Sequence, residues 1–162
     1  MVTQEELKRL FSYDPETGLF TRLIGRKGAA AGEIAGAKMA AGYITIGIKP
    51  KRYYAHRLAW LYMTGEWPDD LLDHINGDRA DNRIKNLRPA LKCQNSFNSK
   101  LNSRNKSGVK GVCWHKAMKK WHVQLRFNGT QQNLGFFDNL DEAEEFVRQA
   151  REKHHGEFAR HA

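Results

Sequence analysis

The sequence predicts an α+β fold: a β-rich N-terminal segment, a central strand–loop–strand–helix unit, and a three-stranded antiparallel sheet packed on one helix. Two patterns support this prediction. Apolar and polar side chains alternate along residues 42–48 and 121–127, as they do in half-buried strands. Residues 140–150 instead repeat apolar side chains every three or four positions, as a helix with one buried face does. With 162 residues, of which 40% are apolar, the chain can form one compact domain or two small ones.

Helix and strand signals alternate in the N-terminal part. Thr3 and Glu6 stand in capping-box spacing, which predicts a short helix over residues 3–10. A turn that feeds a strand follows within residues 13–22. Residues 52–55 are expected to pair with the first alternating strand described above.

A second helix, predicted over residues 56–63, leads into the central unit. It should end where Gly65 and Pro68 break the helical pattern. A short strand is then predicted at residues 71–75, followed by an Asn-Gly-Asp turn and a second short strand near residues 86–88.

The central unit is expected to close with a helix from Pro89 to about Lys100, because proline is tolerated in the first turn of a helix. A polar linker without apolar residues follows at residues 102–107. The sequence therefore predicts two domains, at residues 1–101 and 108–162.

The last part of the chain predicts a sheet and one helix. A first strand is expected at residues 109–115, and Asn128-Gly129 is a hairpin signal that joins strands at residues 121–127 and 131–136. Asn139 should cap the helix that covers this sheet. The side chains expected to face the helix are apolar: Trp121, Val123, Leu125, Phe127, Leu134 and Phe136.

Charge is unevenly distributed along the chain. The formal net charge of +9 favours a polyanionic partner. Residues 99–137 contain eight lysines and arginines and no acidic residue, whereas residues 138–162 contain four basic and seven acidic residues. One face of the module should therefore meet phosphates, and a solvated basic surface is the plain alternative.

The exposed face of the predicted sheet carries the side-chain types that contact phosphates and base edges of double-stranded DNA. The residues expected to bind DNA are Lys110, Trp114, His115, Lys116, Lys119, Lys120, His122, Gln124, Arg126, Gln131 and Asn133. A core or rim position would suit Trp114 equally well.

Residues 108–157 resemble the plant Apetala/ethylene-response-factor DNA-binding domain. The shared motifs are a Gly-Val-x-Gly-Val opening, a Trp-x-Val-x-Leu-Arg strand, a Leu-Gly-x-Phe corner and the first turns of the helix. The resemblance implies DNA contacts for Lys110 and Arg126 and base reading for Gln124. Cys113 and Asn133 replace an arginine and a tryptophan that are usual in that family, so the resemblance implies a docking mode but no target sequence.

Four side chains of the central unit, those of Asp73, His74, Asn86 and Asn95, are expected to come together. The carboxylate of Asp73 and the amide oxygen of Asn95 are hard ligands that suit Mg²⁺ or Mn²⁺. His74 is a base with an ordinary pKa near neutrality, and Asn86 can hold the two strands by hydrogen bonds. A base and a metal without a covalent nucleophile suit metal-assisted phosphodiester hydrolysis.

The stretch DHINGDRADNRIKNLR, within a core at about residues 71–100, resembles the HNH endonucleases, also called ββα-metal or His-Me finger nucleases. It matches the Asn-ended variant of phage and intron homing enzymes. The resemblance implies catalytic roles for His74 and Asn86, with one metal per active site on Asp73 and Asn95. It also implies products with 5′-phosphate and 3′-hydroxyl ends.

Three neighbouring polar residues have plainer interpretations. Asn82 is expected to hydrogen-bond the loop backbone. Asn98 lies one turn after Asn95 and is the alternative ligand, although the spacing favours Asn95. His56 precedes an apolar helix and suits a packing or DNA-proximal role better than a ligand role.

The sequence therefore predicts a phage-type DNA endonuclease, monomeric or dimeric, that nicks one strand per active site. Neither a membrane-spanning run nor a signal-peptide core is present, and Cys93 and Cys113 have no metal-ligand spacing, so the host cytoplasm is the expected location. Two alternatives stay open: a non-catalytic DNA-binding regulator with a relic HNH fold, and an RNA-directed or structural phage protein.

Overall fold

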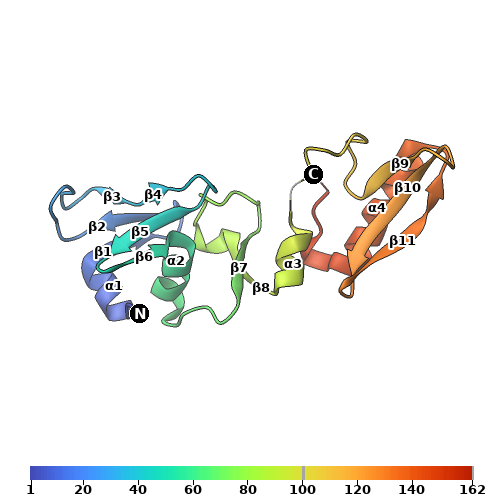
Figure 1. Cartoon of the computed structure of the whole chain (residues 1–162). Coiled ribbons are helices and arrows are strands. Elements are labelled where there is room, and N and C mark those ends of the chain that lie inside the picture. Colours follow the sequence, from blue (N-terminus) through green and yellow to red (C-terminus); the bar gives the residue numbers. More distant parts are fainter. Residues whose placement is uncertain (100, 162) are drawn as a thin grey trace. The chain divides into compact units, whose positions relative to one another are not determined.

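The computed structural model describes residues 1–99 and 101–161, apart from the side chain of Cys93. The chain divides into two compact units, Met1–Leu91 and Lys92–Ala162, and each is described by itself (Figure 1). Within these described residues, several small antiparallel sheets and four α-helices confirm the predicted α+β class. The division falls before the helix at Lys92–Phe97, whereas the sequence predicted it at the polar linker after residue 101.

The first unit contains two three-stranded sheets, a two-stranded sheet and two helices (Figure 1). Its first part consists of α1 (Gln4–Leu10), β1 (Phe11–Asp14), β2 (Leu19–Arg22), β3 (Ile34–Ala35), β4 (Ala37–Lys38), β5 (Ile44–Ile48) and β6 (Lys51–Tyr54). Its second part consists of α2 (Ala55–Thr64), β7 (Leu71–His74), the 3₁₀ turn η1 (Ile84–Asn86) and β8 (Leu87–Ala90). The strand orders are β1-β2-β3, β4-β5-β6 and β7-β8.

One hydrophobic core holds the helices and the first two sheets together. Leu7 of α1, Phe20 of β2, Ile46 of β5 and Leu58 of α2 are all almost completely buried in it. The predicted cap is confirmed, since the Thr3 hydroxyl accepts a hydrogen bond from the Glu6 amide at 3.2 Å. The two sheets and α2 therefore form a rigid support for the chain that follows them.

Strands β7 and β8 form the predicted two-stranded pair, but Pro89 is not in a helix. It lies within β8, opposite Leu72, and α3 begins only at Lys92. An edge strand tolerates proline because the missing amide would otherwise point away from the partner strand. The predicted helix start at Pro89 is therefore wrong by three residues.

The second unit is a three-stranded sheet covered on one face by a long helix (Figure 1). Its elements are α3 (Lys92–Phe97), β9 (Val112–His115), β10 (Lys120–Phe127), β11 (Thr130–Phe137), α4 (Leu140–His155) and the 3₁₀ turn η2 (Gly156–Phe158). Val112, Val123, Ala143 and Val147 form the core between the sheet and α4. The Asn139 cap is confirmed, because its side chain accepts a hydrogen bond from the Asp141 amide at 2.8 Å.

A bulge in β11 changes which aromatic side chain faces the core. Val123 pairs with Gly135 and Gln124 pairs with Asn133, so Leu134 is an extra residue between them. Beyond an extra residue the side chains exchange faces. Phe137 therefore packs in the core, and the prediction that Phe136 does so is wrong.

Candidate active site

The predicted catalytic pair stands at the end of β7. Asp73 is 4% exposed and lies opposite Arg88 of β8 in the strand register. Its Oδ2 accepts hydrogen bonds from Arg88 Nε at 3.1 Å and from Arg88 Nη2 at 2.9 Å. These two hydrogen bonds fix the orientation of the carboxylate. The pair also avoids the large free-energy cost of a buried charge without a partner.

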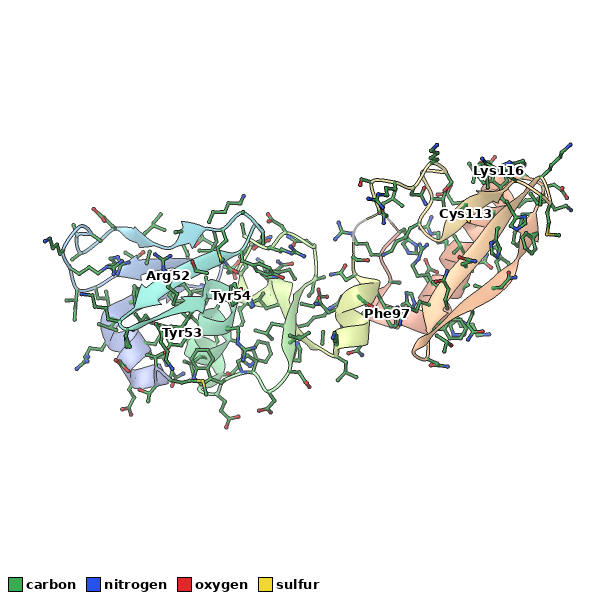
Figure 2. All side chains as sticks on the ribbon, viewed as in Figure 1. Arg52, Tyr53, Tyr54, Phe97, Cys113 and Lys116 are labelled. Carbon is green, nitrogen blue, oxygen red and sulfur yellow. The ribbon has the colours of Figure 1, made fainter. Side chains whose placement is uncertain are left out.

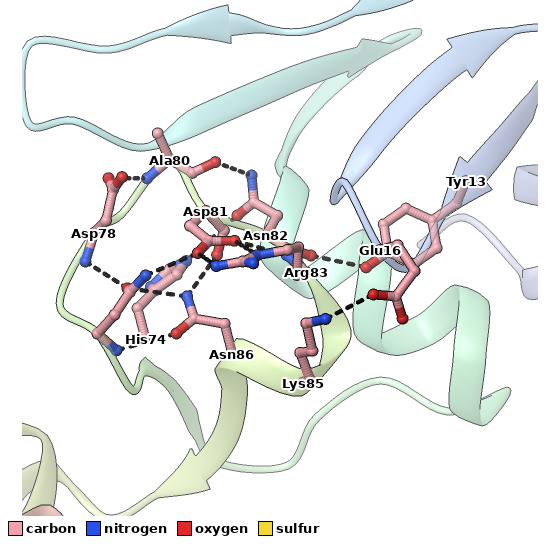
Figure 3. A network of polar contacts seen from close by, with 11 residues as sticks. Tyr13, Glu16, His74, Asp78, Ala80, Asp81, Asn82, Arg83, Lys85 and Asn86 are labelled. Carbon is pink, nitrogen blue, oxygen red and sulfur yellow. Dashed lines mark hydrogen bonds and ion pairs between the residues drawn. The ribbon is translucent and has the colours of Figure 1, made fainter.

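Asn86 fastens the loop that joins the two strands (Figure 3). Its Nδ2 donates to the Asp81 carbonyl at 2.8 Å and to Asn76 Oδ1 at 3.1 Å, while its Oδ1 accepts from the Asn76 amide at 3.0 Å. All three bonds close the loop directly after His74. The expected structural role of Asn86 is confirmed by these contacts, whereas a catalytic role stays a prediction.

Asn82 sets the tautomer of His74. Its Nδ2 donates to the Ala80 carbonyl at 3.1 Å, so the loop-backbone contact expected for Asn82 is confirmed. Its Oδ1 therefore faces His74 Nε2 at 3.3 Å (Figure 3). Because an amide oxygen can only accept, Nε2 carries the ring proton and Nδ1 carries the lone pair. Nδ1 is thus the basic nitrogen of the His74 ring.

His74 is only 4% exposed and lies among aromatic rings. The His56 ring is 5.0 Å away, edge to face, and the Tyr43 ring is 6.0 Å away. Burial lowers the pKa of His74 below its ordinary value, and the bond to Asn82 and the charge of Asp73 partly offset this. His74 is consequently neutral at neutral pH, as a general base must be.

His56 has the packing role that the sequence favoured. It is 6% exposed and stacks on Tyr54 with ring centroids 5.5 Å apart. Burial, followed by the charges of His74 and Arg57, lowers its pKa to about 3. Its buried Nδ1 has no hydrogen-bond partner among the described residues, so His56 is held neutral.

The N-terminal hairpin supports the same loop, a contact that sequence patterns did not reveal. The Tyr13 hydroxyl donates to the Asn82 carbonyl at 2.8 Å, and Lys85 Nζ is 2.6 Å from Glu16 Oε2 (Figure 3). Gly18 in the hairpin turn has φ of +74°, and a Cβ there would lie 2.5 Å from the Arg83 amide nitrogen. Only glycine permits so close an approach to the loop.

The predicted metal ligands lie in different units. Asp73 belongs to the first unit, and Asn95 is exposed on α3 of the second, while Asn98 is buried. Their convergence stays a prediction. Among the described residues, no group of three or more His, Cys, Asp or Glu side chains is placed to hold a metal ion. The carboxylate and amide oxygens still suit Mg²⁺ or Mn²⁺, which would share the Asp73 carboxylate with Arg88.

The polar face of the C-terminal sheet, opposite α4, carries most of the predicted DNA-binding residues. In register, His115 lies beside Lys120, Gln124 beside Asn133, and Arg126 beside Gln131. Arg126, Gln131 and Asn133 are exposed, and Gln131 Nε2 donates to Gln124 Oε1. The face also carries Cys113 of β9, which pairs with His122 in the strand register. Figure 2 labels Cys113 and Lys116, and Lys116 lies in the turn after β9. Lys119 lies in the same turn.

Three predicted contact residues are placed differently from the expectation. Lys110 precedes β9, and its Nζ donates to the carbonyls of Phe97 at 2.8 Å and Ser99 at 2.5 Å. Trp114 is exposed but pairs with Trp121 on the side of α4. His122 is 8% exposed, because Phe136 stacks on it at 4.5 Å, a consequence of the bulge. The expectation that Lys110 and His122 stand exposed on the sheet is therefore wrong.

Comparison with known proteins agrees with the geometry of β7, its loop and β8. Residues 53–96 match the HNH endonuclease family. The chain is 35% identical to Protein 3.8 of Escherichia phage T7 over 106 residues, which is 65% of this chain and 87% of that protein. No solved structure matches the chain at a significant level. None of the helices in the described residues is long and apolar enough to cross a membrane.

Proposed function

Since the chain belongs to the family of phage T7 Protein 3.8 and carries an HNH endonuclease domain, we propose that it is a metal-dependent DNA endonuclease. The observation that supports this most strongly is the fixed tautomer of His74. Asn82 Oδ1 accepts a hydrogen bond from His74 Nε2, which leaves Nδ1 as the basic atom of the ring at the end of β7. A neutral imidazole next to a carboxylate is the equipment for activating water.

The proposed reaction is hydrolysis of a phosphodiester bond. His74 Nδ1 takes a proton from a water molecule, which attacks the phosphorus in line with the departing 3′-oxygen. The bond from phosphorus to the 3′-oxygen breaks, and this oxygen takes a proton from solvent, which leaves a 5′-phosphate and a 3′-hydroxyl. Asn86 and Asn82 keep the loop and the ring in place during this proton transfer.

The proposed ligands of a divalent cation are Asp73 and Asn95. A bound Mg²⁺ or Mn²⁺ would supply positive charge for the negative charge that develops on the phosphate oxygens. Arg88 holds the Asp73 carboxylate in place through their ion pair. The exposure of Asn95, in contrast to the burial of Asn98, supports Asn95 as the second ligand.

The proposed substrate is double-stranded DNA, bound in part by the polar face of the C-terminal sheet. Arg126, Gln124, Gln131 and Asn133 supply a charge and three amides there. Such side chains contact phosphates and base edges. We infer one nick per engagement, site selection of the homing type, and action in the cytoplasm of the host cell.

A plasmid-nicking assay tests the proposal. With Mg²⁺ or Mn²⁺, His74→Ala is expected to lower the nicking rate by ~10²–10⁴-fold, the usual contribution of a positioned general base. Asp73→Asn should also lose cleavage, because the cation loses a charged ligand. DNA affinity should stay within a few-fold of wild type in both variants.

His154→Ala is the matched control, since His154 is exposed on α4 of the other unit. A His74→Ala protein that nicks at the wild-type rate would remove His74 from the reaction. A wild-type protein that binds DNA but never cuts it, with any divalent cation, would favour the non-catalytic regulator instead.

A further inference from the structure

A second polar site lies in the first unit, away from β7 and its loop. A pocket of about 370 Å³ opens beside β2 and the β5–β6 hairpin. Five basic side chains and one acidic side chain, that of Glu33, line it. The basic residues are Arg22, Arg26, Lys49, Lys51 and Arg52, the last of which is labelled in Figure 2. The lining therefore has a large excess of positive charge.

Arg22 is a buried cation that the described residues leave without an acceptor. It is 8% exposed, and its guanidinium lies over the Phe11 ring at 5.3 Å. Among the described residues this guanidinium makes no hydrogen bond or ion pair, although the charge of nearby Glu33 acts on it. Burial and the charge of Arg26 lower the pKa of Arg22, and the charge of Glu33 partly offsets this. Because Arg22 lines the pocket and hydrogen-bonds no described residue, its donors are available to an anion in the pocket.

The opposite wall of the pocket leaves room for that acceptor. Gly47 lies on β5 opposite Arg52, and a Cβ at Gly47 would be 3.9 Å from Arg26 Nη1. The missing side chain thus keeps the space between Arg22, Arg26 and Arg52 open. The volume is within the range of small-molecule sites and exceeds that of a single water molecule many times over.

We propose that this pocket is a phosphate-binding site. Planar guanidinium groups bind phosphate oxygens through paired hydrogen bonds. The lysines add further positive charge, which a ligand with one carboxylate would leave largely unbalanced. The phosphate can come from the DNA backbone or from a free phosphate compound. Only the DNA source rests on the proposed function, since the pocket and its charges exist without the nuclease reaction.

Titration of the full chain with inorganic phosphate at constant ionic strength tests the site. Isothermal calorimetry should show saturable binding by the wild type. Arg22→Met keeps an unbranched side chain at this position but removes the charge, and it should weaken binding by roughly tenfold or more, the usual effect of losing a charged hydrogen bond. Lys38→Met, an exposed β4 position outside the lining, removes the same charge and should bind like wild type.

Gly47→Leu is a second variant that keeps Arg22 and fills the pocket. The backbone φ at Gly47 is outside the left-handed region, so the strand accepts a side chain there. This variant should lose phosphate binding while its circular dichroism and unfolding midpoint stay near wild type. It keeps the proposal testable even if Arg22→Met folds poorly.

Gel shifts on duplex DNA in EDTA distinguish the two sources of phosphate. If the DNA backbone occupies the pocket, Arg22→Met should also shallow the salt dependence of DNA binding by about 0.9 in log–log slope. Loss of phosphate binding with an unchanged slope would support a free phosphate compound. Equal phosphate affinity of wild type and both variants, or no saturable binding, would overturn the site. Nicking by the wild type is measured in a separate assay. The nuclease proposal and the phosphate-site proposal can therefore fail independently.

Discussion

At the scale of single residues, Asn82 orients the His74 ring. Asn82→Ala removes the acceptor of the Nε2 proton and frees the ring to rotate. We expect the nicking rate to fall about 10- to 100-fold, as it does when other orienting partners are removed, with DNA binding unchanged. Asn102→Ala, an exposed asparagine in the other unit, is the control. Nicking at the wild-type rate by Asn82→Ala would mean that the ring is held by other contacts.

His56 makes the stability of the first unit depend on pH. Its pKa in the folded chain is about 3, below the ordinary value of about 6.5. Between these two pH values His56 is therefore protonated in the unfolded chain but not in the folded chain. The stabilisation is complete above pH 6.5 and is lost as pH falls from 6.5 toward 3. Between pH 7 and pH 5 the free energy of unfolding should fall by about 2 kcal/mol.

His56→Phe keeps a ring beside Tyr54 and removes the titrating group. Urea unfolding at pH 7 and pH 5 should therefore show a flatter pH dependence for this variant. The same fall in stability for both proteins would assign the effect to other groups.

Sequence patterns identified the residue types of the site but not their mutual constraints. Asp73, His74 and Asn86 were predicted from motif spacing, and the structure places them at the end of β7 and around its loop. The Asp73–Arg88 pair, the Asn82-set tautomer and the buried Arg22 depend on strand register and on pairing between distant segments. No local pattern encodes such contacts.

At the scale of secondary-structure elements, the N-terminal hairpin determines where the loop after β7 lies. Gly18→Ala places a Cβ 2.5 Å from the Arg83 amide nitrogen, so the loop must shift. We expect a loss of unfolding free energy at least about 1 kcal/mol greater than that caused by Gly28→Ala. Gly28 has a similar φ of +80° with nothing within 4 Å, so this control contains the backbone strain without the clash.

Nicking rates give a second measurement of the same change. Gly18→Ala should slow cleavage because Asn82 moves with Arg83, while Gly28→Ala should cut normally. Equal stability and equal rates for the two variants would show that the hairpin and the loop are not mechanically linked.

Local signals predicted most elements, with errors where tertiary pairing decides. Alternation and caps located α1, α2, β5, β10 and α4, because these depend on side chains close in sequence. The sequence predicted a helix at Pro89 because it does not show that β8 is an edge strand. An edge strand tolerates proline, which has no backbone amide hydrogen to donate. Phe136 was placed in the core because a bulge is a property of two strands together.

At the scale of the whole molecule, the net charge of +9 should make DNA binding strongly salt-dependent. Arg126 is exposed on the polar face, so Arg126→Ala should shallow the log–log salt dependence by about 0.9 for each phosphate that the variant no longer neutralises. Lys153→Ala removes one exposed charge from α4 and should leave the slope unchanged. If both variants change the log–log slope of DNA binding equally, the overall positive charge of the protein determines the salt dependence. The polar face of the sheet would then have no special role in binding DNA.

The bond from the Tyr13 hydroxyl to the Asn82 carbonyl also bears on the order of folding. Its two residues are far apart in sequence, so closing the intervening chain costs entropy before the bond contributes. A ribosome synthesises the hairpin and then α2, on which it packs, before it synthesises the loop. The loop that presents His74 then becomes ordered against an existing template. The loop after β7 should therefore be the last part of the first unit to become ordered during synthesis.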